Sequence, residues 1–204
     1  YHDKSSFTIW VKFRVAYSVQ DFEPAPQAPQ SLQGAQVVIW TTTPWTIPSN
    51  KAVVYGEGIS YGLYEVTDAP EECWAAAGDR FILADKCAED TLTRARLDPA
   101  RYNRVRDVST QELSGLSLTH PLAGAEGANG EWDDPRDFRA ADFVSDEEGT
   151  GFVHCAPSHG MEEFELYRDL GMLEQVITYN VMEDGTFRPD LPFFGGKHIL
   201  REKP

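Results

Sequence analysis

The sequence predicts an α+β fold, a mostly antiparallel, barrel-like β-sheet with a few packed helices. Many short segments have strand patterns, with apolar residues that alternate or gather in brief β-branched runs. Only a few segments have helical periodicity, and they are interleaved with the strands, which favours the α+β class. The 204 residues suffice for one sizeable core, and the chain shows neither an internal repeat nor a second core.

The first half of the chain is predicted to consist mainly of strands. In residues 7–15, FTIWVKFRV, every second residue from Ile9 to Val15 is apolar, as in a strand with one buried face. A proline-rich stretch, residues 23–30, is expected to form a loop. Further strands are predicted at residues 36–40, 51–56, 61–66, 80–84 and 102–109.

Two helices are predicted between these strands. Residues 68–78 have Asp68 as an N-cap and Pro70 in the first turn, and Gly78 ends the segment. Residues 85–96, DKCAEDTLTRAR, are expected to form the second helix.

The second half is predicted to contain a loop, a strand, a helix and two more strands. Residues 123–139 are rich in Gly, Asp and Pro, which indicates a long exposed loop. Phe152 and Val153 form a strand-like run between glycines, and Pro157 cannot continue a ladder. Residues 161–171 have an apolar residue at every third position and a terminal glycine, which is typical of a helix. The strands predicted after it are residues 174–181 and 196–202.

The net charge is strongly negative, because 18 Lys and Arg stand against 33 Asp and Glu, giving −15. This balance argues against broad electrostatic attraction to nucleic acid or to an anionic membrane. Any nucleic-acid partner must therefore meet a local basic patch or be held by something outside this chain. The candidate patches are Arg94 and Arg96, then Arg101, Arg104 and Arg106, and finally Lys197, Arg201 and Lys203, with solvated surface charge as the favoured interpretation of each.

The predicted location is the cytoplasm. Cys73, Cys87 and Cys155 are odd in number and lack CxxC spacing, which favours free thiols in a reducing compartment. The N-terminal residues lack the basic and apolar regions of a secretory signal. No apolar run is long enough to span a bilayer, so no membrane partner is expected.

The first candidate site is the peptide WTTTPWTIPSN, residues 40–50, which follows an apolar run. Its hydroxyls, on Thr41, Thr42, Thr43 and Thr46, can donate and accept hydrogen bonds without adding charge. They are therefore suited to bind an ester carbonyl, a ribose hydroxyl or a water. The alternative is that β-branched threonines simply suit the end of a strand.

The second candidate site joins His154, His159 and Glu163. His154 follows an apolar run and Glu163 falls in the first turn of the next helix, so a strand–loop–helix turn can place both in one cleft. The alternatives are a hydrogen-bonded core histidine and a helix-end charge. A zinc site on His154, Cys155 and His159 is disfavoured because no second ligand pair is present. A nucleophilic Cys155–His pair is disfavoured because no orienting group is evident.

Together these stretches resemble the editing domain of isoleucyl-tRNA synthetase, an insertion in the class I catalytic fold that hydrolyses mischarged tRNA. The resemblance rests on WTTTPWTIPSN and on GTGFVHCAPSHGMEEF at residues 149–164, and it covers nearly the whole chain. The valyl and leucyl editing domains typically carry an Arg in the Thr-rich peptide and Lys or Met at the position of His154, so the isoleucyl branch is indicated. The resemblance implies the class I synthetase editing-domain fold, with residues 1–204 as a single domain and residues 1–20 and 190–204 as strands that link it to a catalytic body.

By this resemblance the substrate is the 3′ end of tRNA(Ile) carrying valine, and the reaction is attack of water on the aminoacyl ester. Thr41, Thr42 and Thr43 are expected to bind the terminal adenosine and the ester and to help position the water. His154 is expected to form part of the wall that excludes isoleucine, and Glu163 to pair with the α-ammonium group. The other predicted substrate-binding residues are Trp45, Thr46, Asn50, Gly149, Thr150, Gly151 and His159; Asn50 is expected to line the pocket, Trp45 to pack beneath the loop, and His159 and the glycines mainly to shape the site.

Position 163 departs from the family, which usually has Asp there within a DD or ED pair, whereas this chain has Glu162 and Glu163. The extra methylene moves the carboxylate by roughly an ångström, and misplacements of that size in a catalytic site can cost about 10²-fold in rate. We expect the pocket to have adjusted around Glu163. No residue is an obvious general base.

The resemblance implies no metal and no organic cofactor. The expected partners are the tRNA(Ile) 3′ end and the rest of the parent synthetase, and the chain is expected to be a monomer. It lacks HIGH-type and KMSKS-type signatures, so aminoacylation is not expected from this chain alone. Without the resemblance, the alternative is a non-catalytic α+β ligand-binding module with a polar pocket.

Overall fold

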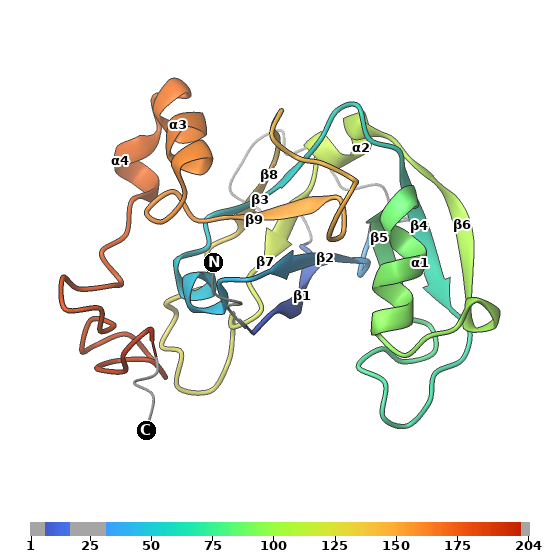
Figure 1. Cartoon of the computed structure of the whole chain (residues 1–204), viewed down its shortest axis with the longest axis horizontal. Coiled ribbons are helices and arrows are strands. Elements are labelled where there is room, and N and C mark those ends of the chain that lie inside the picture. The colour runs from blue at the N-terminus through green and yellow to red at the C-terminus, as the bar shows by residue number, and fades with distance from the viewer. Residues whose placement is uncertain (1–6, 17–31, 201–204) are drawn as a thin grey trace, which may run out of the picture.

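A computed structural model describes residues 7–16 and 32–200 of the chain (Figure 1). The predicted loop at residues 23–30 and the basic residues Arg201 and Lys203 lie outside the described residues. The strands are β1 (Ile9–Val15), β2 (Gln36–Thr41), β3 (Ala52–Tyr55), β4 (Tyr61–Val66), β5 (Arg80–Ala84), β6 (Tyr102–Val108), β7 (Ser117–Thr119), β8 (Arg136–Ala140) and β9 (Phe152–Cys155). The helices are α1 (Asp85–Arg94), α2 (Thr110–Ser114), α3 (Met161–Asp169) and α4 (Leu173–Val176), with 3₁₀ turns at Pro44–Ser49 and Pro99–Arg101.

The strands form one sheet in the order β6-β4-β5-β2-β1-β7-β8-β3-β9. The pairs β2–β5 and β3–β8 are parallel and the other pairs are antiparallel, so the sheet is mostly antiparallel. The predicted α+β class is therefore confirmed. The barrel-like closure is not confirmed, because β6 and β9 are the two ends of the sheet and do not pair. The sheet nevertheless curves enough for β9 to lie against β2, as Figure 1 shows.

The alternation predicted for β1 divides its residues between two faces. Phe13 pairs with Val37 across to β2, and both side chains are fully buried in the main core. On the other face Trp10 pairs with Trp40, and Lys12 and Arg14 follow along the strand.

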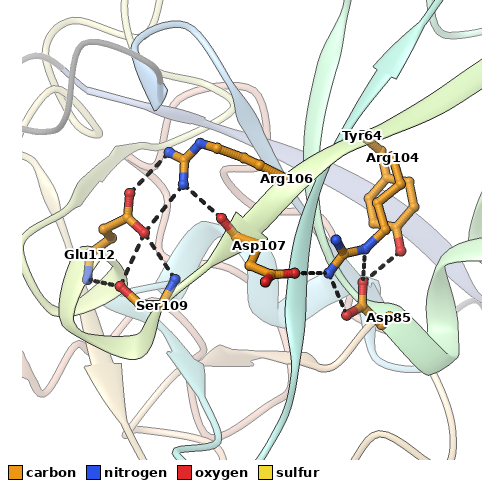
Figure 2. Close-up of polar contacts among 7 residues, drawn as sticks. All are labelled: Tyr64, Asp85, Arg104, Arg106, Asp107, Ser109 and Glu112. Atoms are coloured by element: carbon orange, nitrogen blue, oxygen red, sulfur yellow. Dashed lines mark hydrogen bonds and ion pairs between the residues drawn. The ribbon is translucent and has the colours of Figure 1, made fainter.

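The first residue of α1 is fixed to the sheet by polar contacts (Figure 2). Asp85 accepts two hydrogen bonds from Arg104 of β6, at 2.9 and 2.8 Å, and one from the Tyr64 hydroxyl of β4 at 2.7 Å. The hydrogen bonds from Arg104 hold the pKa of Asp85 below its usual range. A Cβ on Gly62 would lie 2.6 Å from Asp85 Oδ1, so this approach requires glycine. These contacts fix the first residue of α1 to β4 and β6.

A capping box begins the short helix α2, and its residues Ser109 and Glu112 are also drawn in Figure 2. Ser109 Oγ accepts from the Glu112 backbone N–H at 3.2 Å, and Glu112 Oε2 accepts from the Ser109 N–H at 2.9 Å. Arg106 pairs with the same Glu112 carboxylate at 2.9 Å. Helix α2 and the strand β7 after it were not predicted.

The predicted helix at residues 68–78 is wrong, because this segment forms turns between β4 and β5. The two strands are antiparallel neighbours, and Gly78 N–H still bonds to the Val66 carbonyl at 2.8 Å. Gly78 has φ +88°, which turns the chain back into β5. Trp74 packs edge-on against Phe81 of β5, with ring centroids 5.2 Å apart. The segment is a hairpin connection held by its own side chains.

Three predictions in the second half also need correction. Residues 174–181 are not a strand: α4 ends at Val176, and only Val181 makes a bridge, to Phe187. Residues 196–200 contain a single bridge residue, His198, instead of a strand. The loop predicted at residues 123–139 ends in β8, and its Trp132 is 1% exposed because it packs between aromatic rings.

The other predicted strands and the helices at residues 85–96 and 161–171 are confirmed to within a few residues. Cys73, Cys87 and Cys155 are free thiols, as predicted. Among residues 7–16 and 32–200, no helix combines the length and the apolar character needed to cross a membrane.

Candidate functional site

A cavity of about 500 Å³ lies where β2 ends, beside β9 and the start of α3. It brings together the two candidate peptides, residues 40–50 and 149–164. Three side-chain contacts join the peptides, and the two partners of each contact are 104 to 110 residues apart in the sequence. Its lining residues are Trp40, Thr41, Thr42, Thr43, Thr46, Phe143, Ser145, Glu147, Glu148, Gly149, Phe152, Val153, His154, Ala156, His159, Gly160 and Glu163.

The threonine run forms one wall of the cavity. Thr41 is the last residue of β2, and its Oγ1 accepts a hydrogen bond from the Thr43 backbone N–H at 3.0 Å. The Oγ1 atoms of Thr41 and Thr43 lie 3.2 Å apart. Pro44 then begins a 3₁₀ turn, and Thr46 Oγ1 donates to the Thr43 carbonyl at 2.8 Å. The strand end and the turn therefore hold hydroxyls at one edge of the cavity, with Thr42 and Thr43 exposed.

His154 of β9 is held on both of its ring nitrogens. Asn50 Nδ2 lies 2.6 Å from His154 Nδ1 and also donates to the Ala52 carbonyl at 2.7 Å. Thr46 Oγ1 lies 2.9 Å from His154 Nε2 and donates its own hydrogen to the Thr43 carbonyl. Since Asn50 donates at Nδ1, we assign the neutral tautomer with the proton on Nε2. Burial lowers the pKa of His154 to about 4, so the imidazole is neutral near pH 7.

Glu163 lies in the first turn of α3, half-buried in the cavity wall. Burial raises the pKa of its carboxyl, and the neighbouring Glu162 adds to this rise. Its carboxylate folds back over Gly160, where a Cβ would lie only 1.7 Å from Glu163 Oε2. The close approach of this side chain to the backbone therefore depends on a glycine at the N-cap of α3.

The electrostatic character of the cavity follows from its lining. Of the described residues, three carboxylates line it (Glu147, Glu148 and Glu163) and no Lys or Arg does, and burial lowers the pKa values of its two histidines. Such a site favours a cationic group on a ligand over an anionic one. Among the described residues, no group of three or more His, Cys, Asp and Glu side chains is arranged to hold a metal ion.

Comparison with known proteins identifies the relatives of the chain. The chain is 72% identical to the isoleucine–tRNA ligase of Ruegeria pomeroyi over 203 residues, which are 100% of this chain and 20% of that protein. It is 40% identical to the isoleucine–tRNA ligase of Rhodopseudomonas palustris over 209 residues, again 100% of this chain and 19% of that protein. The chain is thus homologous, over its whole length, to a segment of isoleucine–tRNA ligases. It spans about a fifth of the length of these relatives. No protein-family model matches it.

Solved structures of other synthetase domains share the fold of the chain. The crystal structure of GlLeuRS-CP1 superimposes with a TM-score of 0.53 at 17% identity, covering 94% of this chain and 74% of that chain. The editing domain of the P. knowlesi cytosolic leucyl-tRNA synthetase gives a TM-score of 0.54 at 12% identity, covering 87% of this chain and 66% of that chain. The fold is thus that of the class I synthetase editing domain, as the resemblance implied.

Most of the residues expected from the isoleucine–tRNA ligase resemblance line the cavity. They are Thr41, Thr42, Thr43, Thr46, Gly149, His154, His159 and Glu163. The other four lie behind the lining. Asn50 is 1% exposed and bonds to His154 from behind, and Trp45 packs edge-on against His159 at 5.1 Å between ring centroids. Thr150 is fully buried, and Gly151 approaches Ala84 so closely that a Cβ would lie 2.2 Å from the Ala84 Cβ.

Several cavity residues of this isoleucine–tRNA ligase homologue were not predicted. The most informative are Trp40, Phe143, Glu147, Glu148 and Gly160. Trp40 directly precedes the threonine run, and Glu147 and Glu148 directly precede Gly149, so their position beside the two peptides was the available signal. Phe143 had no such signal, because it lies in the segment between β8 and β9, away from both peptides in the sequence. It lines the cavity because the fold brings this segment beside the two peptides.

Proposed function

We propose that the chain hydrolyses valyl-tRNA(Ile), removing valine from the terminal adenosine and leaving isoleucyl-tRNA(Ile) intact. A pocket built for isoleucine rejects valine, one methylene smaller, by only about 10–200-fold, and isoleucyl-tRNA synthetase is itself a known example of this limit. A second pocket that admits valine and excludes isoleucine by size corrects the resulting errors. The relatives named isoleucine–tRNA ligase and the editing-domain fold support this function.

The observation that carries the proposal is the single cavity in which the threonine hydroxyls face a neutral histidine and a carboxylate. An aminoacyl ester has a neutral carbonyl, ribose hydroxyls and a cationic α-ammonium group. The hydroxyls can bind the first two without adding charge. The carboxylates provide for the third.

Thr41, Thr42 and Thr43 are proposed to bind the terminal adenosine and the ester and to position the attacking water. The Thr41 and Thr43 hydroxyls are already paired at 3.2 Å, so they form a fixed donor and acceptor at the wall. Water adds to the ester carbonyl, the bond to the ribose oxygen breaks, and valine and a free ribose hydroxyl are released. Positioning and hydrogen bonding of this kind can carry much of the rate for an activated ester.

His154 is proposed to be part of the wall that excludes isoleucine. Its nitrogens are bonded to Asn50 and Thr46, so neither is available to take a proton from water without breaking a buried contact. Its lowered pKa, about 4, also makes it a weak base. A rigid neutral ring is well suited to a size limit and poorly suited to general-base catalysis.

Glu163 is proposed to bind the α-ammonium group in place of the usual Asp. The close packing of its carboxylate over Gly160 draws the longer side chain back toward the helix N-terminus, which offsets part of its extra length. The partly desolvated setting that raises its pKa also strengthens an ion pair with a bound cation.

The remaining proposals concern the whole chain. We propose that residues 1–204 act as a single domain of a longer synthetase, as a monomer, on the 3′ end of tRNA(Ile). The alternative, a non-catalytic ligand-binding module, is not favoured by the homology to isoleucine–tRNA ligases.

The test is hydrolysis of valyl-tRNA(Ile) and isoleucyl-tRNA(Ile), and of short 3′-end esters that need no other part of the synthetase. We expect loss of valine with isoleucine retained. A Glu163→Ala variant should lose about 10²-fold in kcat/KM, while Glu163→Asp, which keeps the charge but moves it by roughly an ångström, should lose part of the activity. Wild-type chain that hydrolyses neither the tRNA nor the short valyl ester would contradict the proposal, and Glu163→Ala at the normal rate would contradict the role of Glu163.

A further inference from the structure

Two more hollows continue the surface beyond the site cavity. The first shares Trp40 and Gly149 with the cavity and extends to Trp10 and Arg94. The second shares Trp10 with the first and extends along β1 past Lys12 and Arg14 to Trp74. Because each hollow shares lining residues with the next, the three lie next to one another on the surface. We call the part beyond the cavity, lined by Trp40, Trp10, Arg94, Lys12, Arg14 and Trp74, the β1 groove.

The β1 groove is built on one face of two neighbouring strands. Trp10 and Trp40 are cross-strand partners of β1 and β2, which lie side by side in Figure 1, and their ring centroids are 6.4 Å apart. Lys12 and Arg14 are the next residues on this face of β1. Trp10 to Arg14 spans about 13 Å of extended strand, so the groove has the length of a track and not of a single subsite.

Cations and aromatic rings alternate along this groove. The Arg94 guanidinium lies 5.4 Å from the centroid of the Trp10 ring, and Lys12 Nζ lies 4.6 Å from that of Trp74. The Arg14 side chain is exposed and makes no hydrogen bond or ion pair with the residues that the structure describes. Among the described residues that line the hollow at Lys12 and Arg14, no carboxylate balances these two cations, which is unusual on a chain of net charge −15.

We infer that the β1 groove binds the single-stranded RNA segment that leads to the 3′-terminal nucleotide in the site cavity. The inference rests on the proposed function, which supplies the terminal nucleotide. Proteins that hold single strands combine cations along the backbone with aromatic rings on which bases stack, and the groove offers both. Lys12 and Arg14 contact phosphates, and Trp10 and Trp40 provide stacking surfaces.

Acidic groups at the middle of the groove fix where the phosphates can lie. Asp90 lines this section but is paired with Arg94 at 2.7 Å. Glu147 and Glu148 are exposed where the groove meets the cavity. They repel phosphate and favour an uncharged base or ribose at that point. The phosphate contacts therefore belong at the β1 end, at Lys12 and Arg14.

Binding of an unacylated RNA tests the groove whether or not the ester is hydrolysed. The probe is a fluorescent single-stranded hexanucleotide ending in 3′-CCA, measured by anisotropy at several salt concentrations below physiological. We expect the double variant Lys12→Gln/Arg14→Gln to weaken binding, and to reduce the slope of log Kd against log salt by about 1.4, since each phosphate contact on a single strand contributes about 0.7. The matched control is Arg168→Gln on α3, an exposed cation that lines none of the three hollows.

Three results would overturn the inference: no binding by the wild-type chain, equal slopes for wild type and double variant, or an equal loss in the Arg168→Gln control. A 3′ blunt-ended RNA duplex of the same charge should bind more weakly than the hexanucleotide. Equal affinity for the duplex would indicate a nonspecific cation patch and would also contradict the inference.

Hydrolysis of two esters separates this inference from the proposed function. Valyl-adenosine fills only the cavity, whereas a valyl ester of the hexanucleotide also reaches the groove. The double variant should hydrolyse valyl-adenosine at the wild-type rate and lose the extra kcat/KM that the longer ester gains. Failure of the wild type on both esters counts against the proposed function. Equal behaviour of wild type and double variant on the longer ester counts against the groove.

Discussion

The carboxylate of Glu163 occupies space that a side chain at position 160 would need. A Cβ on Gly160 would lie within 2.7 Å of both carboxylate oxygens, whereas the backbone at Gly160 has φ −121°, which any residue can adopt. Gly160 is therefore required by the position of Glu163 and not by the turn. This contact links the departure of the sequence from the family at position 163 to the geometry of the site.

Gly160→Ala should move the Glu163 carboxylate while leaving its charge in place. We expect a loss of kcat/KM for the valyl ester approaching about 10²-fold, because errors of an ångström in a catalytic site have that effect. Thermal stability should change little, since only the end of a flexible side chain must shift. Glu163→Gln, which keeps the shape and removes the charge, is the comparison. A Gly160→Ala variant with wild-type kinetics would show that the position of this carboxylate is unimportant.

At the scale of elements, the start of β9 is held to the start of α1 through the backbone. Ala84 N–H donates to the Thr150 carbonyl at 3.2 Å, and Gly151 has φ +78° with no room for a side chain. This contact joins the strand that carries His154 to the end of β5, although the two strands are not neighbours in the sheet.

Gly151→Ala should destabilise the chain more than a glycine change elsewhere. Its Cβ would lie 2.2 Å from the Ala84 Cβ and 3.4 Å from the Ala84 Cα, so backbone must move in addition to the strain of a positive φ. Gly171→Ala is the matched control, because Gly171 has φ +68° with open space around it. Urea unfolding should show a loss of about 1 kcal/mol for the control and a loss larger by about 1–3 kcal/mol for Gly151→Ala. Equal losses would show that the Ala84 contact contributes nothing.

The same elements show why the sequence predicted strands better than it predicted helices. Strands such as β2 and β5 are continuous apolar runs whose burial is visible from composition. Residues 68–78 have the start and stop signals of a helix, but the pairing of β4 with β5 requires the segment to return within a hairpin. Helix α2 has the S-x-x-E signature of its capping box, but its five residues are too few for a helical periodicity to show in the sequence. Capping and turn residues mark where a segment begins, whereas strand pairing determines whether the segment is a helix or a hairpin connection.

At the scale of the whole molecule, the site could be predicted only in part. The two peptides were recognisable because each carries its own chemistry. Phe143, by contrast, depends on the path of the chain between β8 and β9, and the joining of β1 to the cavity depends on the pairing of Trp10 with Trp40. Asn50 was expected in the pocket, yet it lies behind His154, because its amide is hydrogen-bonded to His154 Nδ1 and to the Ala52 carbonyl. Sequence motifs thus identified the residues of the site but could not show which of their side chains enter the cavity.

Two buried histidines make the stability of the whole molecule depend on pH. Burial lowers the pKa of His120 to about 3 and that of His154 to about 4, and both rings are hydrogen-bonded. In the unfolded chain their pKa is about 6.5, so below that pH the unfolded state binds more protons than the folded state. The free energy of unfolding is therefore highest above pH 6.5 and falls as the pH falls toward 4. Asp85, whose pKa is lowered by Arg104, adds to this loss only near and below its unfolded pKa of about 3.9.

Urea unfolding between pH 7 and pH 4.5 measures this dependence. His120 and His154 together should contribute up to about 2.7 kcal/mol per pH unit to the slope, since each proton contributes about 1.36. His159, whose pKa is also lowered by burial, adds to the slope in the same direction. His120→Gln removes one of these groups and should reduce the slope by about 1.36 kcal/mol per pH unit. It also lowers stability at pH 7 by leaving the Ile47 carbonyl or the Leu122 N–H without its present partner. A free energy of unfolding that stays constant from pH 7 to pH 5, or a slope unchanged in His120→Gln, would show that these rings are not held neutral by the fold.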